Sequence, residues 1–386
     1  MMKKITALLL ILLLFTVSGC AREEKTIYLC TDLHYFSHDL HDDGPLFNRM
    51  LKTITMLTEY TPEILDEFTN KVIEDHPDYL ICAGDITFNG ELVDLKQVAE
   101  RFAKIEEAGI PVLAIPGNHD ILYYHSAGYD NEEYYETPAI TPEDYLNVMG
   151  DFGYNDALYR CEESFTYVYP INDQCWALMM DTNFPGTRGT LDGDTYQWIK
   201  EILEIAKDQK KEVFTVTHQP LLPQNSRMAL GYTIYNSEQV LTLLKSYDIK
   251  YNFSGHVHIQ HMVSNGDITD IATGSMAVLN LNYGVIEVSD KDIKYHFETQ
   301  EKYSDLANKR FDDLTREQIS ELVKSAFKPE DQQRVSQFMI EINNLYFSGA
   351  LTKEYVDEHK ELIDLITTTV EKSWGSYIAS MTEGLE

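Results

Sequence analysis

The chain contains five short runs of apolar residues that each stop at a polar side chain. They are rich in β-branched and aromatic residues and begin at Thr26, Tyr79, Val112, Val213 and Tyr251. Continuous apolar runs of this length indicate strands that are buried on both faces. Between them lie helical stretches such as residues 91–108, and Thr61-Pro62-Glu63 has the form of an N-cap followed by proline. Alternating strands and helices predict an α/β fold with a mostly parallel sheet.

The side chains that end these runs are of the kinds that bind metal ions. They are Asp32 and His34, then Asp85, then Asn118, His119 and Asp120, then His218, and finally His256 and His258. Ligands bind beyond the carboxyl ends of the strands in such sheets, so these side chains are expected to converge on one edge. Imidazole and carboxylate together suit Mn, Fe or Zn better than Ca or Mg. Without His119 and Asp120, seven candidate ligands remain, and they suit two ions that share a bridging carboxylate.

The order Asp-x-His, Gly-Asp, Gly-Asn-His-Asp, His and Gly-His-x-His resembles that of the calcineurin-like metallophosphoesterase family. All five blocks are present in family order between Asp32 and His258. The resemblance implies a four-layer αββα sandwich of two mixed sheets, with a dinuclear centre at one end, in a catalytic domain placed at residues 25–300. It further implies that one metal ion is held by Asp32, His34 and His258, the other by Asn118, His218 and His256, and that Asp85 bridges them.

Two cations placed in this way would lower the pKa of a shared water, so the expected reaction is hydrolysis of a phosphoester by a metal-bridging hydroxide. His119 lies beside a ligand in the sequence and is assigned to the leaving-group side as general acid, with Asp120 fixing its tautomer. A His119 that only forms hydrogen bonds is the alternative.

Within the family, the spacing and the added helical region resemble the bacterial cyclic-nucleotide phosphodiesterase branch. A phosphodiester substrate is therefore expected, with a cyclic nucleotide as one candidate. A phosphomonoesterase or nucleotidase that acts on extracytoplasmic substrates has the same metal ligands and is the alternative. A non-catalytic binding lipoprotein is less favoured, because no ligand is missing from the five blocks.

The amino end has the pattern of a bacterial lipoprotein signal peptide. Lys3 and Lys4 precede the apolar run Ile5–Val17, which at 1.5 Å per residue is too short to span about 30 Å of hydrocarbon. Val17-Ser18-Gly19-Cys20 resembles a lipobox, so residues 1–19 are predicted to be removed and Cys20 to be lipidated. An uncleaved anchor is the alternative. Both place the protein outside the cytoplasm, at the bacterial cell membrane.

The composition narrows the class of partner. The formal net charge of -32 argues against nucleic-acid polymers and against direct contact with an anionic membrane, because both require a basic surface. A small phosphorylated substrate is expected instead, with a metal ion supplying the local positive charge, and membrane attachment is expected only through the lipid.

The last part of the chain differs in kind from the rest. Strand signals stop after a predicted hairpin at residues 283–299, and residues 301–386 are expected to form about four or five amphipathic helices. One is predicted to start at the capping box Thr315-x-x-Gln318. One helix face is formed by Val335, Phe338, Met339, Ile342 and Tyr346. This C-terminal helical domain either forms one side of the cleft or binds a protein partner.

Three further features allow two interpretations each or none that is functional. Ten of the 25 tyrosines lie between Tyr123 and Tyr169 and either cover the metal site, stacking on a substrate ring, or simply pack together. The histidines and aspartates at residues 38–43 form either a third metal site or a solvated acidic loop. Cys30 and Cys82 lie in apolar runs as small hydrophobes, and no disulfide is predicted.

Overall fold

The computed structural model describes residues 24–385 except 187, 290 and 291. The predicted signal peptide, the lipobox and Cys20 lie outside the described residues. In the part of the chain that is described, no helix is both long and apolar enough to cross a membrane.

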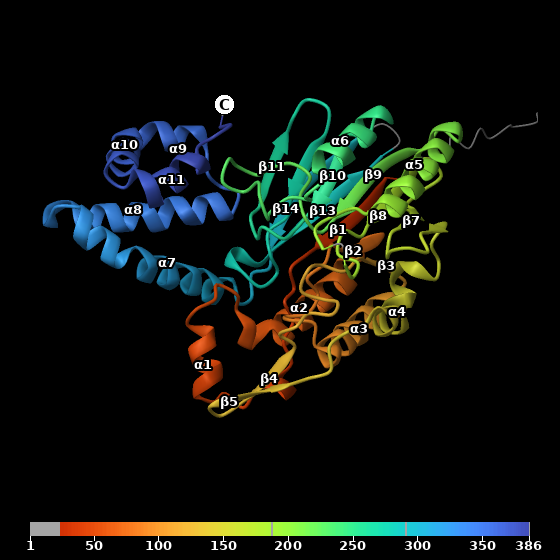
Figure 1. The fold of residues 1–386 in the computed structure, drawn as a ribbon, viewed down its shortest axis with the longest axis horizontal. Helices are drawn as coiled ribbons and strands as arrows, with labels where there is room; N and C mark the ends of the chain where they lie inside the picture. Colours follow the sequence, from red (N-terminus) through yellow and green to blue (C-terminus); the bar gives the residue numbers. More distant parts are fainter. Residues whose placement is uncertain (1–23, 187, 290–291, 386) are drawn as a thin grey trace, which may run out of the picture.

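Within the described residues, two mixed β-sheets form the centre of the molecule (Figure 1). The first sheet has the order β14-β13-β1-β2-β3. Its strands are β1 (Lys25–Cys30), β2 (Tyr79–Cys82), β3 (Val112–Ala114), β13 (Asn282–Val288) and β14 (Ile293–Thr299). β1, β2 and β3 are parallel, and β13 and β14 form an antiparallel hairpin, as predicted for residues 283–299.

The second sheet has the order β11-β12-β10-β9-β8-β7-β6. Its strands are β6 (Tyr159–Arg160), β7 (Tyr167–Pro170), β8 (Cys175–Met180), β9 (Glu212–Thr217), β10 (Tyr251–Ser254), β11 (His261–Ser264) and β12 (Thr269–Ala272). β8, β9, β10 and β12 are parallel. The five predicted strands are therefore all present, but three of them belong to one sheet and two to the other.

Helices cover the outer face of each sheet. Alternate residues of β8 show this arrangement, because Trp176, Leu178 and Met180 pack with helices α5 (Gly193–Asp208) and α6 (Ser237–Ser246), whereas Cys175, Ala177 and Met179 share a core with the other sheet. The same core joins the first sheet to α2 (Thr61–Asp75) and α3 (Leu92–Glu107). The predicted four-layer αββα sandwich is confirmed.

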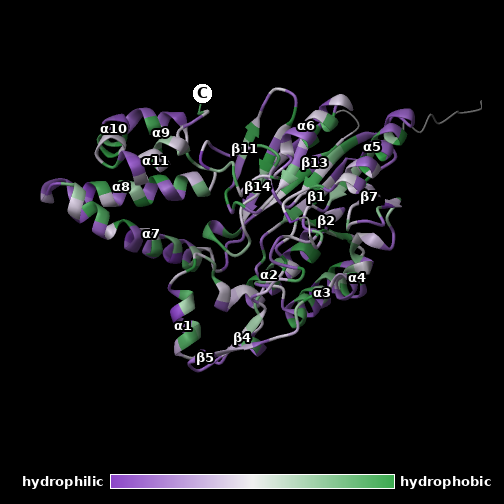
Figure 2. Cartoon of the chain, viewed as in Figure 1, coloured by the Kyte–Doolittle hydropathy of each residue, from purple (hydrophilic) through white to green (hydrophobic). Residues whose placement is uncertain are grey.

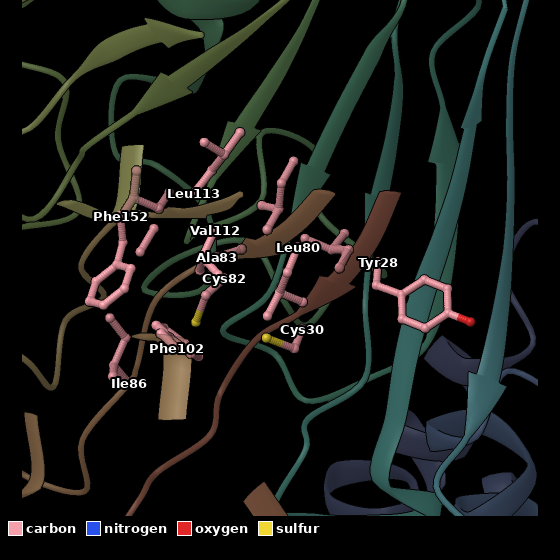
Figure 3. Packing of buried hydrophobic residues seen from close by; sticks show 14 of the residues in the cluster. Tyr28, Cys30, Leu80, Cys82, Ala83, Ile86, Phe102, Val112, Leu113 and Phe152 are labelled. Atoms are coloured by element: carbon pink, nitrogen blue, oxygen red, sulfur yellow. The ribbon is translucent and has the colours of Figure 1, made fainter. Parts of the chain in front are cut away.

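The buried cysteines lie at the centre of this core. Cys30 of β1 is in register with Cys82 of β2, and both side chains are fully buried. Figure 3 shows them on neighbouring strands close to Leu80 and Phe102. They are free thiols and pack as small apolar side chains.

The predicted helix starts need two corrections. Helix α2 does begin at Thr61, but the Thr61 hydroxyl donates to the carbonyl of Thr58 and accepts from the amide of Phe36, so it does not cap the helix. Asp192, which was expected to lie in a simple turn with Gly193 and Asp194, is the N-cap of α5 and accepts the amides of Asp194 and Thr195.

The segment between β3 and β6 contains the dense tyrosines. It includes the hairpin β4 (Ala127–Asp130) and β5 (Glu133–Glu136), which lies beside α1 (Pro45–Leu51) in Figure 1, and then α4 (Pro142–Met149). Short 3-10 helices occur at His38–Leu40, Thr58–Tyr60 and Leu279–Leu281, and π-type turns at Gly150–Tyr154 and Glu371–Gly375.

The C-terminal helices lie beside β11 and β14, at the edges of the two sheets (Figure 1). They are α7 (Ser304–Ala326), α8 (Pro329–Phe347), α9 (Lys353–Glu358), α10 (Lys360–Thr369) and α11 (Ser376–Met381). Figure 2 shows apolar and polar residues alternating along them, and the predicted apolar face of α8 is buried. The capping box at Thr315 is wrong: α7 continues through it, and Thr315 is buried and accepts a hydrogen bond from Asn343.

Candidate metal centre

The candidate ligands follow the carboxyl ends of strands from both sheets. Asp32 and His34 follow β1, Asp85 follows β2, Asn118 follows β3, His218 follows β9, and His256 and His258 follow β10. Five of these residues have left-handed backbones, with φ between 41° and 69°: Asp32, His34, Asp85, His256 and His258. Such conformations are unfavourable for side chains other than glycine and persist where the surroundings enforce them, commonly at functional sites.

Two glycines allow these segments to approach each other. A Cβ atom on Gly117 would lie 2.2 Å from the backbone nitrogen of Asp85, and one on Gly255 would lie 2.0 Å from Oγ1 of Thr31 and 2.6 Å from Oδ2 of Asp32. No side chain fits at these distances. The glycines of the Gly-Asn-His-Asp and Gly-His-x-His blocks are therefore required by packing.

Asp32, His34 and His258 form the first group of candidate ligands, with ligand atoms within 4.8 Å of one another. The Nε2 atoms of His34 and His258 are 3.1 Å apart, and Nε2 of His258 is 3.2 Å from Oδ1 of Asp32. That Oδ1 atom is buried without a hydrogen-bond partner. A buried, unpaired carboxylate oxygen facing two imidazole nitrogens fits a transition-metal cation.

Asp85, His218 and His256 form the second group, again within 4.8 Å. The Oδ1 atom of Asn118 joins them, 3.1 Å from Nε2 of His218. Oδ2 of Asp85 lies 3.2 Å from Nε2 of His218 and 3.8 Å from Nε2 of His34. One carboxylate oxygen therefore faces both groups, and all seven predicted side chains meet at one place.

Backbone carbonyls determine which ring nitrogen of the histidines is free. Nδ1 of His218 donates to the carbonyl of Ala83 at 2.8 Å, and Nε2 of His256 donates to the carbonyl of Gly231 at 3.3 Å. The other nitrogen of each ring is then available to a metal ion. Carbonyl oxygens occur at every residue, so the sequence carries no signal for these partners.

The charges of the site also suit cations. Burial opposes ionisation of Asp32, but His258 and His218 outweigh it and lower its pKa to about 2. Burial lowers the pKa of His34 to about 3 and that of His256 to about 4. Near neutral pH these groups are therefore carboxylate and neutral imidazole, the forms that bind metals. His218 differs, because Asp85 outweighs the effect of burial and raises its pKa to about 9.

His119 lies next to the two groups. Its backbone N–H donates to Oδ1 of Asp85 at 2.8 Å, and its ring is 5.1 Å from that of His34. Ring Nδ1 donates to the carbonyl of Phe88 at 2.9 Å, with Oδ1 of Asn89 at 3.2 Å. Nε2 is then the nitrogen that remains for proton transfer.

The tautomer role expected for Asp120 is corrected. Its buried carboxylate accepts the amides of Gly117, Ile86 and Thr87 and the Thr87 hydroxyl, at 2.7 to 3.2 Å. Asp120 thus holds together the loops after β2 and β3, and Phe88 fixes the His119 ring. Neighbours in sequence need not be neighbours in a hydrogen-bond network, which is why the prediction failed.

Two residues near His119 were missed by the sequence analysis. The Tyr123 ring stacks on the His119 ring at 4.8 Å, and the Arg188 guanidinium lies 5.4 Å from the centre of the Tyr123 ring. Arg188 also donates to the carbonyls of Ile121 and Leu122. Nothing in the sequence distinguishes Arg188, because it comes from a loop between β8 and α5.

The histidines of residues 38–43 do not join the centre. His38 lies 3.3 Å from His41 and 2.9 Å from Glu63, and His41 stacks on Phe47. The described part of the chain contains no third group of metal-type ligands. The solvated loop is the interpretation that the structure favours for this segment.

Comparisons with known proteins agree with this geometry. The family model described as calcineurin-like phosphoesterase matches residues 25–260, so the chain belongs to the calcineurin-like phosphoesterase family. It is 24% identical over 235 residues, 61% of this chain and 75% of the relative, to a Fibrobacter succinogenes protein named as a probable cyclic nucleotide phosphodiesterase.

Solved structures show the same fold. A dimetal phosphatase from Danio rerio superposes with a TM-score of 0.52 at 12% identity, covering 71% of this chain and 96% of that one. An anchor protein of the inner membrane complex of Plasmodium has a TM-score of 0.44 at 14% identity, covering 72% and 85%. The chain is thus a hydrolase of phosphate esters with two candidate metal-binding groups.

Proposed function

We propose that the protein is a dinuclear, metal-dependent phosphodiesterase. The observation that carries this proposal is the position of Asp85, whose Oδ2 atom faces both groups of candidate ligands. Asp32, His34 and His258 would hold one ion, and Asn118, His218 and His256 the other, with Asp85 shared. Bound Mn, Fe or Zn ions would supply a nucleophile at neutral pH and stabilise charge on the phosphoryl oxygens.

The chain's own residues supply orientation and a proton. Asp120 keeps the loops after β2 and β3 together, so that Asp85 and Asn118 present their side chains to one centre. Phe88 and Tyr123 fix the His119 ring, which leaves Nε2 to give a proton to the departing oxygen.

The activity is tested by metal removal and reloading. The protein beginning after Cys20 is stripped with a chelator, and hydrolysis of bis-(4-nitrophenyl) phosphate is followed while Mn²⁺ is added. The proposal expects no turnover without metal and full turnover near two ions per chain. Activity that is unaffected by the chelator would contradict it.

We also propose where the organic part of the substrate lies. A cavity of about 630 Å³ begins at Asn89, which contacts His119, and is lined by Tyr124, Tyr129 and Tyr134. The rings of His119, Tyr123 and Tyr124 form one stacked series, with spacings of 4.8 and 5.3 Å. Arg49 in the cavity wall is paired with Glu132. Its charge is compensated, so the cavity suits a neutral aromatic ring, such as a nucleobase, better than a second phosphate.

Tyr124→Ala tests this subsite. Tyr124 is 79% exposed, so its removal should leave the fold intact, and kcat/KM for a nucleoside phosphodiester should fall about 5- to 100-fold, the range expected from loss of one stacked ring. Hydrolysis of glycerophosphoethanolamine, which has no ring, should change little. Tyr135→Ala, in the same hairpin but outside the cavity lining, is the matched control. Equal losses on both substrates would exclude a ring-binding role.

The cellular location is part of the proposal and rests on residues 1–20 alone. We propose export and lipidation at Cys20, so that the enzyme acts outside the cytoplasm. The mass of the mature amino-terminal peptide tests this directly, since a diacylated or triacylated cysteine at its first position is expected.

A further inference from the structure

The segment that carries two candidate ligands has its other side against the C-terminal helices. His256 and His258 face the two ligand groups, whereas Val257 and Ile259 belong to the apolar cluster formed by the C-terminal helices. The next residue, Gln260, donates its N–H to the carbonyl of Phe347 at the end of α8, at 2.9 Å. The helices therefore form the support on which the Gly-His-Val-His segment is built.

The loop between β9 and α6 is attached to the same helices. Nδ2 of Asn225 donates to the buried hydroxyl of Tyr346 at 2.7 Å, and that hydroxyl lies 3.4 Å from the carbonyl of Gln224. Oδ1 of Asn225 accepts the amides of Arg227 and Met228. A single phenol hydroxyl of α8 thus fixes a tight turn in the loop.

Further contacts attach the residues that follow. Ser226 donates from both its N–H and its hydroxyl to the carboxylate of Glu383, at 2.9 and 2.6 Å. The guanidinium of Arg227 donates to the hydroxyl of Ser376, and Met228 is buried in the apolar cluster of the helices. The described loop is therefore held at three successive residues by the last part of the chain.

Beyond this attachment the loop reaches the second ligand group. Gly231 has a φ of 84° and presents its carbonyl to Nε2 of His256 at 3.3 Å. This hydrogen bond leaves Nδ1 of His256 free for a metal ion, and partners of this kind typically change metal affinity by about 10- to 100-fold. A shift of the loop would remove the carbonyl without altering any ligand.

We propose that the C-terminal helices set the affinity of the second metal ion, by fixing the Gly231 carbonyl against His256 and by supporting the His256-Val257-His258 segment. The inference rests on the proposed dinuclear centre. It assigns Tyr346 and Glu383 as positioning residues, and it decides between the two roles left open for this region in favour of forming part of the site.

The test is metal binding by the full chain, without any assay of activity. Metal-free protein is titrated with Mn²⁺, the free ion is followed by electron paramagnetic resonance, and Tyr346→Phe and Glu383→Ala are compared with wild type. We expect one of the two dissociation constants to rise about tenfold or more and the other to stay unchanged. Amide exchange in residues 224–235 should become faster in the same variants.

Matched controls come from the same helices. Tyr355→Phe changes a tyrosine that stacks on His359, and Glu321→Ala changes a carboxylate paired with Lys324, both among the helices themselves. Two unchanged dissociation constants in the test variants, or equal rises in the controls, would overturn the inference. Should Tyr346→Phe fail to fold, Glu383→Ala, at an exposed contact, still decides it.

The two proposals fail in different ways. If wild-type protein binds two ions but hydrolyses no phosphoester, the proposed function is wrong, and the binding comparison still decides the role of the helices. If wild type is an active phosphodiesterase and the variants bind both ions normally, only the role of the helices is wrong.

Discussion

Asp85→Asn is expected to lower metal-dependent hydrolysis of a phosphodiester by at least about a hundredfold, the scale on which loss of one charge-stabilising group acts. Oδ2 of Asp85 is the oxygen that faces both ligand groups, 3.2 Å from His218 and 3.8 Å from His34. An amide has the same shape but no charge, and its NH₂ group cannot share two cations. The variant should bind fewer than two ions per chain, measured by metal analysis beside kcat.

Folding should be nearly unaffected by this change, because the amide oxygen of Asn can keep the hydrogen bond from the His119 N–H. Asp66→Asn, at a half-exposed carboxylate paired with Arg101, is the control and should retain normal activity. A residual rate for Asp85→Asn above about a tenth of wild type would be too high for loss of such a group and would remove Asp85 from the bridging role.

His119→Ala is expected to slow substrates with poor leaving groups by about 10²- to 10⁴-fold, the usual contribution of a positioned general acid. A sugar or alkyl oxygen needs a proton as it departs, whereas nitrophenolate is stable without one. The loss on bis-(4-nitrophenyl) phosphate should therefore be much smaller. Rates on an alkyl diester and on the nitrophenyl diester are compared for the same preparation.

His125→Ala is a suitable control for this variant, since His125 is exposed and lies on the Tyr124 side of the ring series. It should leave the ratio of the two rates unchanged. Equal losses on both substrates in His119→Ala would mean that His119 only forms hydrogen bonds, the alternative raised by its contacts to Phe88 and Asn89.

The ligands were accessible to sequence reasoning because each follows a buried strand. The apolar runs before Asp32, Asp85 and Asn118 predict strands, and parallel strands bring their carboxyl ends to one edge. A local run does not say which sheet a strand joins, however. The division of β9 and β10 from β1–β3 depends on packing between distant segments, and only the resemblance to a family anticipated two sheets.

The missed features depend on tertiary contacts. Thr315 and Gln318 have the spacing of a capping box, but Thr315 is buried against Asn343 of α8, so packing keeps the helix continuous. The carbonyls of Ala83 and Gly231 that fix His218 and His256 have no side-chain signature. The domain boundary predicted after residue 300 stays a prediction, although Val257 and Ile259 share a core with the helices beyond it.

The central claim is that the two ligand groups form a phosphodiesterase centre, and one comparison tests it most directly. Mn-dependent hydrolysis of bis-(4-nitrophenyl) phosphate is measured against that of 4-nitrophenyl phosphate, with the soluble chain that begins after Cys20. The account predicts a higher kcat/KM for the diester. A clear preference for the monoester would contradict it in favour of an outward-facing phosphatase, and no turnover of either ester with any divalent metal would favour a binding protein that keeps the fold.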